Sequence, residues 1–158
     1  MIETTLSMNL MDALDNIQDA AVLWEQWCDE DAKLDRADAD GYLRDLVDRV
    51  RGGQFCMVIA RDGDTPVGMA QIQVRYDSSV SETAAFMDQM YVAMDYRGEG
   101  VAHQLACAMK VCTELMGATS ALLPCDEKLC GFYEQYGWER YQVLMKRGDE
   151  PMTHERLT

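Results

Sequence analysis

The sequence predicts a mixed α+β fold in which helices cover both faces of one largely antiparallel sheet. Two helical patterns open the chain, and three strand-like segments joined by short turns follow. A glycine-rich loop then leads into a third helix and a further strand. The 158 residues are one domain of ordinary length, and a composition of 48% hydrophobic and 27% charged residues argues against a disordered chain.

The first third of the chain is predicted to hold one short strand and two helices. The strand is expected at Thr4 to Leu10. A second helix is expected from about Ala37 to Gly52-Gly53, since glycine often terminates helices. The first helix is predicted because apolar residues recur every three or four positions, at Leu10, Ala13, Ile17, Ala20, Trp24 and Trp27.

An antiparallel meander of three strands is predicted next. Phe55 to Ala60 is an apolar run of strand length, and Asp62-Gly63 is a strong hairpin signal. The chain is expected to return over Val67 to Val74, to pass through a polar loop at Arg75 to Glu82, and to form its third meander strand at Ala84 to Ala93.

The second half alternates helices and strands. A right-handed crossover is expected to place its first strand parallel to the third strand of the meander. One helix face is formed by Val101, Leu105, Ala108, Cys112 and Leu115. The elements expected after it are a strand at Ser120 to Pro124, a short helix at Asp126 to Gln135 and a final strand at Trp138 to Met145.

Charge disfavours several classes of partner. The chain has 28 acidic and 14 basic residues, a net charge of −14, which disfavours binding to nucleic acids and anionic membranes and favours cationic partners. Residues 1–50 alone carry a net charge of −9. This local acidity fits a solvated helical face, a generally acidic protein from a salt-rich habitat, or a wall that attracts a positively charged substrate.

The cysteines and histidines indicate neither a disulfide framework nor a metal site. None of the six cysteines forms a Cys-x-x-Cys motif, and His103 and His154 fit no zinc-binding spacing. No segment is apolar enough to span a membrane, and the N-terminus lacks the features of a secretory signal. We therefore expect a cytoplasmic protein with reduced thiols and no metal.

A candidate anion site lies where the third meander strand ends. The turn Arg97-Gly98-Glu99-Gly100 connects this strand to the next helix. The first N–H groups of a helix lack partners and form the positive end of its dipole, and glycines let a bulky anion approach the backbone. Arg97 adds a charge that suits phosphate. A pyrophosphate is therefore the expected ligand.

Two motifs carry a resemblance to a known family. Arg97, Gly100 and Ala102 form Arg-x-x-Gly-x-Ala, after a strand that ends in Met-Tyr-Val. Further on, the segment from Asp126 to Trp138 contains Phe-Tyr-x-x-x-Gly-Trp. With these motifs the sequence resembles the GNAT superfamily of acetyl-CoA-dependent N-acetyltransferases.

The resemblance implies a GNAT-like fold, with six or seven strands, about four flanking helices, and splayed fourth and fifth strands. It covers residues 54–147 well and the earlier residues only in the order of elements. One N-acetyltransferase domain is expected over residues 1–158, with a helical acceptor-side region at 1–53, a cofactor-binding core at 54–147 and a tail at 148–158.

The resemblance also implies acetyl-CoA as the cofactor and assigns residues to it. The pantetheine arm pairs with the end of the fourth strand, where a bulge usually splays the strands, and a backbone N–H near Met90 or Tyr91 is expected to stabilise the oxyanion. Asp126 replaces the usual asparagine beside the arm, and a carboxylate does not donate the amide's hydrogen bond. The implied cofactor-binding residues are Met90, Tyr91, Val92, Arg97, Gly98, Glu99, Gly100, Val101, Ala102 and Asp126.

Two catalytic residues follow from the same resemblance. Tyr133 takes the place of the family's frequent general acid, whose phenol protonates the leaving thiolate; packing between helix and sheet is the alternative. Asp88 takes the place of a base that removes a proton from the amine; an exposed strand residue or a salt bridge is the alternative. Strand alternation predicts that Asp88, Met90 and Val92 share one face.

The predicted function is acetyl transfer from acetyl-CoA to a primary amine, by direct attack in a ternary complex. A non-catalytic acyl-CoA sensor and an acidic interaction protein are the alternatives, and a homodimer is the commonest symmetric assembly for such a chain. The acceptor is expected to be a polyamine, an aminoglycoside-like molecule or a basic protein segment. This expectation of a cationic acceptor rests on acidic residues of the acceptor-side region: Asp29, Glu30, Asp31, Asp35, Asp38 and Asp40.

Overall fold

The computed structural model describes residues 1–7, 10–31 and 34–141. The chain divides into two compact units, Met1–Leu123 and Pro124–Thr158, of which the second holds α4. In chain order the elements are β1 (Ile2–Ser7), α1 (Leu10–Glu30), η1 (Arg36–Asp38), α2 (Ala39–Gly52), β2 (Phe55–Asp62), β3 (Thr65–Asp77), β4 (Glu82–Val92), η2 (Met94–Tyr96), α3 (Val101–Leu115), β5 (Ser120–Leu122) and α4 (Glu127–Glu134).

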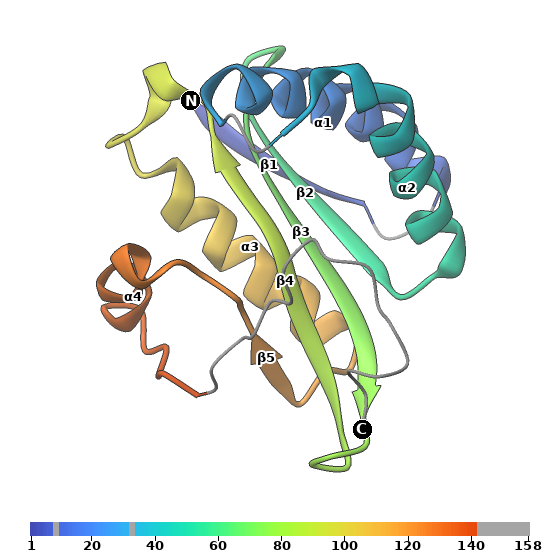
Figure 1. Ribbon diagram of the computed structural model, residues 1–158, viewed down its shortest axis with the longest axis vertical. Coiled ribbons are helices and arrows are strands. Elements are labelled where there is room, and N and C mark those ends of the chain that lie inside the picture. Colours follow the sequence, from blue (N-terminus) through green and yellow to red (C-terminus); the bar gives the residue numbers. More distant parts are fainter. Residues whose placement is uncertain (8–9, 32–33, 142–158) are drawn as a thin grey trace, which may run out of the picture. The chain divides into compact units, whose positions relative to one another are not determined.

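One mixed sheet in the order β1-β2-β3-β4-β5 forms the centre of the first unit (Figure 1). Strands β1 to β4 pair antiparallel, whereas β5 pairs parallel with β4 over Ala84–Phe86 and Ser120–Leu122. The predicted parallel pairing after the crossover is therefore confirmed. The mixed α+β class is also confirmed, although the described residues form five strands and not the expected six or seven.

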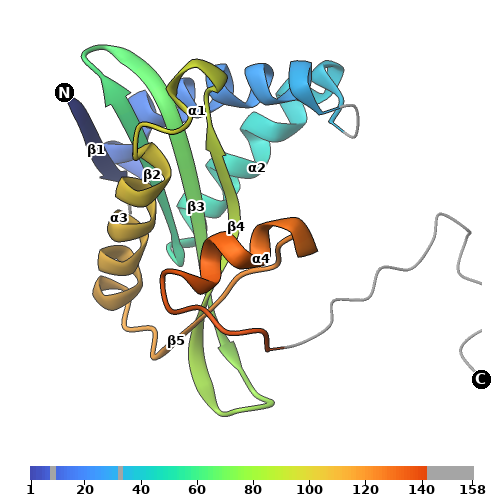
Figure 2. The same ribbon diagram turned by 90° about the vertical axis from the view of Figure 1, so that its left-hand side faces the viewer.

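Helices cover both faces of this sheet (Figure 2). The buried cluster between α1, α2 and the sheet includes Leu23, Leu46, Phe55, Met57 and Met69. The cluster between α3 and the sheet includes Val58, Ala70, Ile72, Leu105 and Met109. Because β2 contributes to both clusters, its side chains are buried on both faces, which explains the unbroken apolar run in its sequence.

The hairpin between β3 and β4 is longer than predicted. Half of the segment expected as a polar loop is strand, because β3 continues to Asp77 and β4 begins at Glu82. Asp77 holds the turn, since its carboxylate accepts hydrogen bonds from the backbone N–H and the hydroxyl of Ser79 at 3.0 and 2.6 Å. Polar residues obscured the strand here because this end of the hairpin is solvated; Tyr76 is 64% exposed.

Two other expectations are wrong or lie outside the described residues. The predicted final strand is absent over residues 138–141, and its remaining residues, 142–145, lie outside the described part of the chain. The expectation of six reduced thiols is wrong for one pair, because a disulfide joins Cys56 of β2 to Cys112 of α3. The other four cysteines are free thiols.

Candidate active site

Strand β4 contains a β-bulge at Asp88. Gln71 of β3 lies opposite Gln89, and the next residue, Ile72, lies opposite Met87, so Asp88 is an extra residue in the ladder. Such a bulge bends the strand and re-aims its side chains. The bulge that the family resemblance implied near the end of this strand is thus present, at the predicted base itself.

The bulge separates Asp88 from the residues expected to share its face. The Asp88 carboxylate lies 2.5 Å from Arg49 of α2, which places it on the α1–α2 side of the sheet. Met90 and Val92 instead pack against the cluster beneath α3. The expectation that these three residues share one face is therefore wrong, because simple alternation does not hold across an extra residue.

The end of β4 has a free edge toward β5. The two strands pair only over Ala84–Phe86, and no described strand pairs with β4 on this side from Met87 to Val92. The splayed geometry expected of the fourth and fifth strands is consistent with this arrangement. Unpaired strand edges offer N–H and C=O groups to an extended ligand, so this edge fits the pantetheine arm of coenzyme A.

The loop after β4 opens onto the N-terminus of α3. Gly98 and Gly100 have φ values of +82° and +84°, a left-handed conformation that favours glycine. A Cβ atom added at either position would have no atom within 4 Å, so the backbone here is open to approach. The helical ladder begins with the Gln104 N–H, which donates to the Gly100 carbonyl at 3.1 Å. The preceding N–H groups have no intrahelical acceptor and suit a pyrophosphate.

Arg97 braces this loop and is not a free charge. Its Nη2 lies 2.5 Å from a carboxylate oxygen of Glu30, and its Nε donates to the Val92 carbonyl at 3.0 Å. Tyr91 donates to the other oxygen of Glu30 at 2.6 Å. Glu30 therefore connects α1 to two residues of the predicted cofactor segment, and its carboxylate is paired with the Arg97 charge that was expected to attract phosphate.

The same cluster has shifted pKa values. Burial opposes the ionisation of Glu30, but hydrogen bonds from Tyr91 and Arg97 outweigh it and lower the pKa of this carboxyl. Burial, and then the hydrogen bond to Glu30, raises the pKa of the Tyr91 phenol. Glu30 is therefore the charged acceptor of the cluster, and Tyr91 remains a neutral donor.

Gly68 of β3 positions the start of α3. A Cβ atom at this residue would lie 3.0 Å from Val101, 3.1 Å from Leu105 and 3.2 Å from the Tyr91 carbonyl. Only glycine lets the first turn of α3 approach the sheet this closely. An isolated glycine within a strand pattern is the sequence signal for such an approach, although Gly68 was not among the residues predicted for the site.

Tyr133 and Asp126 belong to the second unit. Tyr133 lies in α4 and packs edge-on against Phe132 and Trp138. Burial, with a smaller contribution from Cys125, raises the pKa of its phenol, so Tyr133 stays protonated at neutral pH, as a proton donor must be. Asp126 occupies the N-cap position of α4 without a capping hydrogen bond. The roles of both residues stay predictions.

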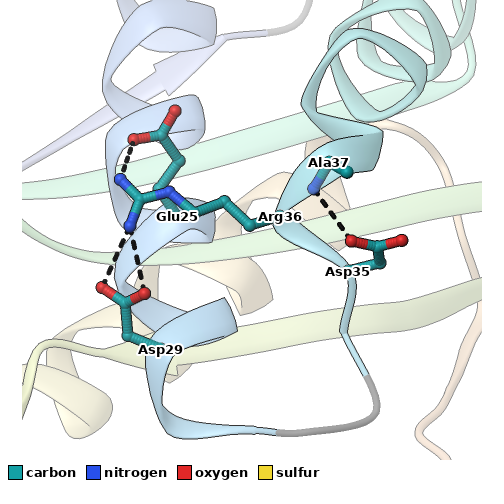
Figure 3. Close-up of polar contacts among 5 residues, drawn as sticks. All are labelled: Glu25, Asp29, Asp35, Arg36 and Ala37. Atoms are coloured by element: carbon teal, nitrogen blue, oxygen red, sulfur yellow. Dashed lines mark hydrogen bonds and ion pairs between the residues drawn. The ribbon is translucent and has the colours of Figure 1, made fainter.

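The acidic acceptor-side region is partly neutralised from within. Arg36 bridges Glu25 and Asp29 of α1, each at 3.1 Å, and Asp35 accepts a hydrogen bond from the Ala37 N–H at 2.9 Å (Figure 3). Glu30, Asp29 and Asp35 are thus engaged, so at least three of the six acidic residues expected to face the acceptor already have partners. The negative wall is therefore weaker than its sequence suggests.

Among the described residues, no three His, Cys, Asp or Glu side chains are grouped as a metal ion would require. None of the helices in the described ranges combines the length and the apolar character that crossing a bilayer demands.

Comparison with known proteins assigns the family. The model of the acetyltransferase (GNAT) family matches residues 16–138, well over half of the chain. The chain belongs to the GNAT acetyltransferase family. None of the curated proteins matches its sequence. The predicted membership is confirmed. The prediction of an acetyltransferase that uses acetyl-CoA is also confirmed at the level of this family.

Solved structures share the fold of this GNAT acetyltransferase. An acetyltransferase from Trypanosoma brucei is 16% identical, with 94% of this chain and 99% of that chain covered and a TM-score of 0.70. Glucosamine-6-phosphate N-acetyltransferase from Arabidopsis thaliana is 12% identical, with 94% and 99% covered and a TM-score of 0.72. The structure of AAC(6')-Iy with a CoA bisubstrate analogue is 20% identical, with 94% and 98% covered and a TM-score of 0.73.

Proposed function

We propose that this GNAT acetyltransferase moves the acetyl group of acetyl-CoA to a primary amine by direct attack in a ternary complex. The observation that carries the proposal is unpaired backbone at two neighbouring places along one path. No described strand pairs with the β5-side edge of β4 at Met87–Val92, and the glycine turn with the N-terminus of α3 follows it along the chain. This path suits, in order, the thioester with its pantetheine arm and the pyrophosphate.

Each predicted residue has one role in this proposal. Asp88 takes a proton from the ammonium group, directly or through water, so that the amine nitrogen can attack the carbonyl carbon. A backbone N–H at Met90 or Tyr91 stabilises the oxygen as it gains negative charge. Tyr133 supplies a proton to the sulfur as the carbon–sulfur bond breaks. Asp126 lies beside the pantetheine arm, as the resemblance implies.

The acceptor is proposed to be cationic at its reacting end. A net charge of −14 supports a polyamine, an aminoglycoside-like molecule or a basic protein segment, and one structural neighbour is an aminoglycoside N-acetyltransferase. The internal pairing of Glu25 and Asp29 with Arg36 weakens this support. An amine that also carries an anion, as in the neighbour named for glucosamine-6-phosphate, is a second candidate.

The test is the substitution Tyr133→Phe, measured with an acetyl-CoA consumption screen over a panel of amines. We expect kcat to fall about 100-fold, because the leaving thiolate loses its proton donor. Affinity for acetyl-CoA, measured by calorimetry, should not change. Tyr141→Phe, at an exposed residue, is the matched control. Tight acetyl-CoA binding with no turnover on any amine would favour a non-catalytic sensor, and no binding would favour an acidic interaction protein.

A further inference from the structure

A polar hollow of about 340 Å³ opens on the α1–α2 side of the sheet, beside the predicted base. It is lined by Arg49 of α2, Gln73 and Arg75 of β3, and Phe86 and Asp88 of β4. In Figure 1 the β3–β4 hairpin continues past the end of α2, so this helix does not cover the far part of the hairpin. The volume is at the small end of the range for ligand pockets.

The two arginines of this hollow are in different electrostatic states. Arg49 lies 2.9 Å from Asp45 and 2.5 Å from Asp88, so two carboxylates compensate its charge. Arg75 lies over the Phe86 ring, 3.7 Å from its centroid. Within the part of the chain that the structure describes, Arg75 makes no ion pair. The Arg75 guanidinium therefore lies in a hollow of a strongly acidic protein without a salt-bridge partner, although Asp77 is near enough to interact with it electrostatically.

Stacking on Phe86 prepares Arg75 to bind an anion. The ring contacts the face of the guanidinium, which leaves its N–H groups for a partner in the plane of the group. A guanidinium presents these N–H groups as a fixed fork that matches carboxylate and phosphate oxygens. Because the ring limits the motion of the side chain, less conformational entropy is lost when an anion binds.

The hollow also limits how far this anion can lie from the chemistry, with the spacing of a regular strand as the guide and the bulge at Asp88 as a local departure from it. Asp88 and Phe86 are two residues apart in β4 and both line the hollow. Two residues of antiparallel strand span about 7 Å. One small molecule can therefore place an ammonium group at Asp88 and an anionic group at Arg75.

We infer that the acceptor of this enzyme is an amine that also carries a carboxylate or phosphate about 7 Å from the reacting nitrogen, and that Arg75 binds this anion. The inference rests on the proposed function and narrows its substrate class. Arg49 holds Asp88 in place between the two ends of the acceptor. Polyamines, which lack an anion, become poor acceptors under this assignment.

The test compares acceptors of equal length that differ only at the far end. The probes are 6-aminohexanoate, its neutral amide and 1,6-diaminohexane. Glucosamine 6-phosphate and glucosamine form a second pair, which separates phosphate from carboxylate as the preferred anion. We expect kcat/KM for at least one anionic probe to exceed that of its matched neutral probe by 10-fold or more, and the diamine to be no better than the amide.

Substitutions at Arg75 assign this preference to one side chain. Arg75→Gln should raise KM for the preferred anionic probe 10-fold or more and leave KM for its neutral partner unchanged. Arg75→Lys should restore part of the loss, and Arg75→Glu should reverse the preference toward the diamine. Arg44→Gln, on the exposed side of α2, should change none of these values.

Three outcomes separate the two proposals. If neutral probes or the diamine react as well as the anionic ones, the inference is wrong and the proposed function stands. In a second outcome, an anionic probe binds the acetyl-CoA complex in calorimetry, does not bind the Arg75→Gln variant and is never acetylated. The anion site is then supported, and the proposed acetyl transfer to such a probe is wrong. If no anionic probe binds or reacts at millimolar concentration, the inference is overturned.

Discussion

The role of Glu30 in the structure differs from the role that its negative charge suggested in the sequence. From its sequence, Glu30 was expected to belong to an acidic wall for the acceptor, but in the structure it accepts hydrogen bonds from both Tyr91 and Arg97. These partners are 61 and 67 residues away along the chain, so no local pattern contains the contact. Asp88 is the converse case, because a salt bridge was among its stated alternatives and Arg49 supplies one.

The substitution Glu30→Gln should destabilise the fold by about 1 kcal/mol at pH 7, because charge-assisted hydrogen bonds to Tyr91 and Arg97 are lost. It should also raise KM for acetyl-CoA several-fold, since both partners flank the cofactor path. Glu25→Gln, in an exposed pair with Arg36, is the control and should change stability by less than about 0.5 kcal/mol.

The effect of Glu30→Gln should depend on pH. The folded state lowers the pKa of Glu30, so its ionised form stabilises the protein above the unfolded value of about 4.3. That contribution is lost as pH falls through the folded-state pKa. Urea denaturation at pH 7 and at pH 3.5 should therefore show a smaller difference between the two proteins at the lower pH. An equal difference at both values would contradict this account of the cluster.

At the scale of elements, the order along the chain was predictable but local irregularities were not. Apolar periodicity and turn residues located every α-helix and strand of the first unit, because each signal lies within a few residues, but they did not locate the two 3-10 helices η1 and η2. The bulge at Asp88 gave no such signal, since it depends on how β4 pairs with β3. The strand expected at Trp138 is the opposite error, because its pattern fits a strand but residues 138–141 do not pair.

The contact between β3 and α3 can be tested with one methyl group. Gly68→Ala should destabilise the protein by about 1–2 kcal/mol, because the added Cβ meets Val101 and Leu105 at 3.0 and 3.1 Å and these atoms must move. The displaced first turn of α3 should also raise KM for acetyl-CoA. Gly52→Ala, with no atom within 4 Å of the new Cβ, should be neutral or slightly stabilising. Chemical denaturation and steady-state kinetics measure both effects.

The glycine turn can be tested through backbone conformation alone. Gly100→Ala adds a side chain into open space, but it forces a left-handed conformation at φ +84° on an alanine. We expect a loss of about 1 kcal/mol in stability and a weaker Kd for acetyl-CoA, because the backbone relaxes away from its ligand-ready shape. Gly131→Ala, in a helix of the second unit, is the control. Unchanged cofactor affinity in Gly100→Ala would count against the turn as the pyrophosphate site.

At the scale of the whole molecule, the family could be predicted from the sequence, but the pairing of charged residues could not. The Arg-x-x-Gly-x-Ala motif can be recognised in the sequence because the backbone geometry of the turn requires residues of these types next to one another. The net charge does not show which charges form ion pairs. In the structure Arg36 and Arg97 pair with acidic residues, whereas Arg75 forms no salt bridge with any described residue. These pairings depend on tertiary contacts between elements.

The excess of negative charge should make stability depend on salt. At a net charge of −14, repulsion between exposed carboxylates destabilises the compact state. Raising KCl from 0.05 to 0.5 M shortens the screening length from roughly 14 Å to about 4 Å and should raise Tm by several degrees. Differential scanning calorimetry measures this shift. A falling Tm would mean that attractive pairs such as Arg61 with Asp19 outweigh the repulsion.

The bulge in β4 also changes which residues of the strand face α3. Before it, the odd-numbered residues Ala85 and Met87 face α3; after it, the even-numbered Met90 and Val92 do. Removing a residue from either side of the bulge would exchange the two faces of that half of the strand, whereas removing the extra residue itself would restore regular alternation and keep both halves as they are. Length changes during divergence are therefore expected in the turn at 78–81 or at the bulge, and not in the parts of β4 on either side of it.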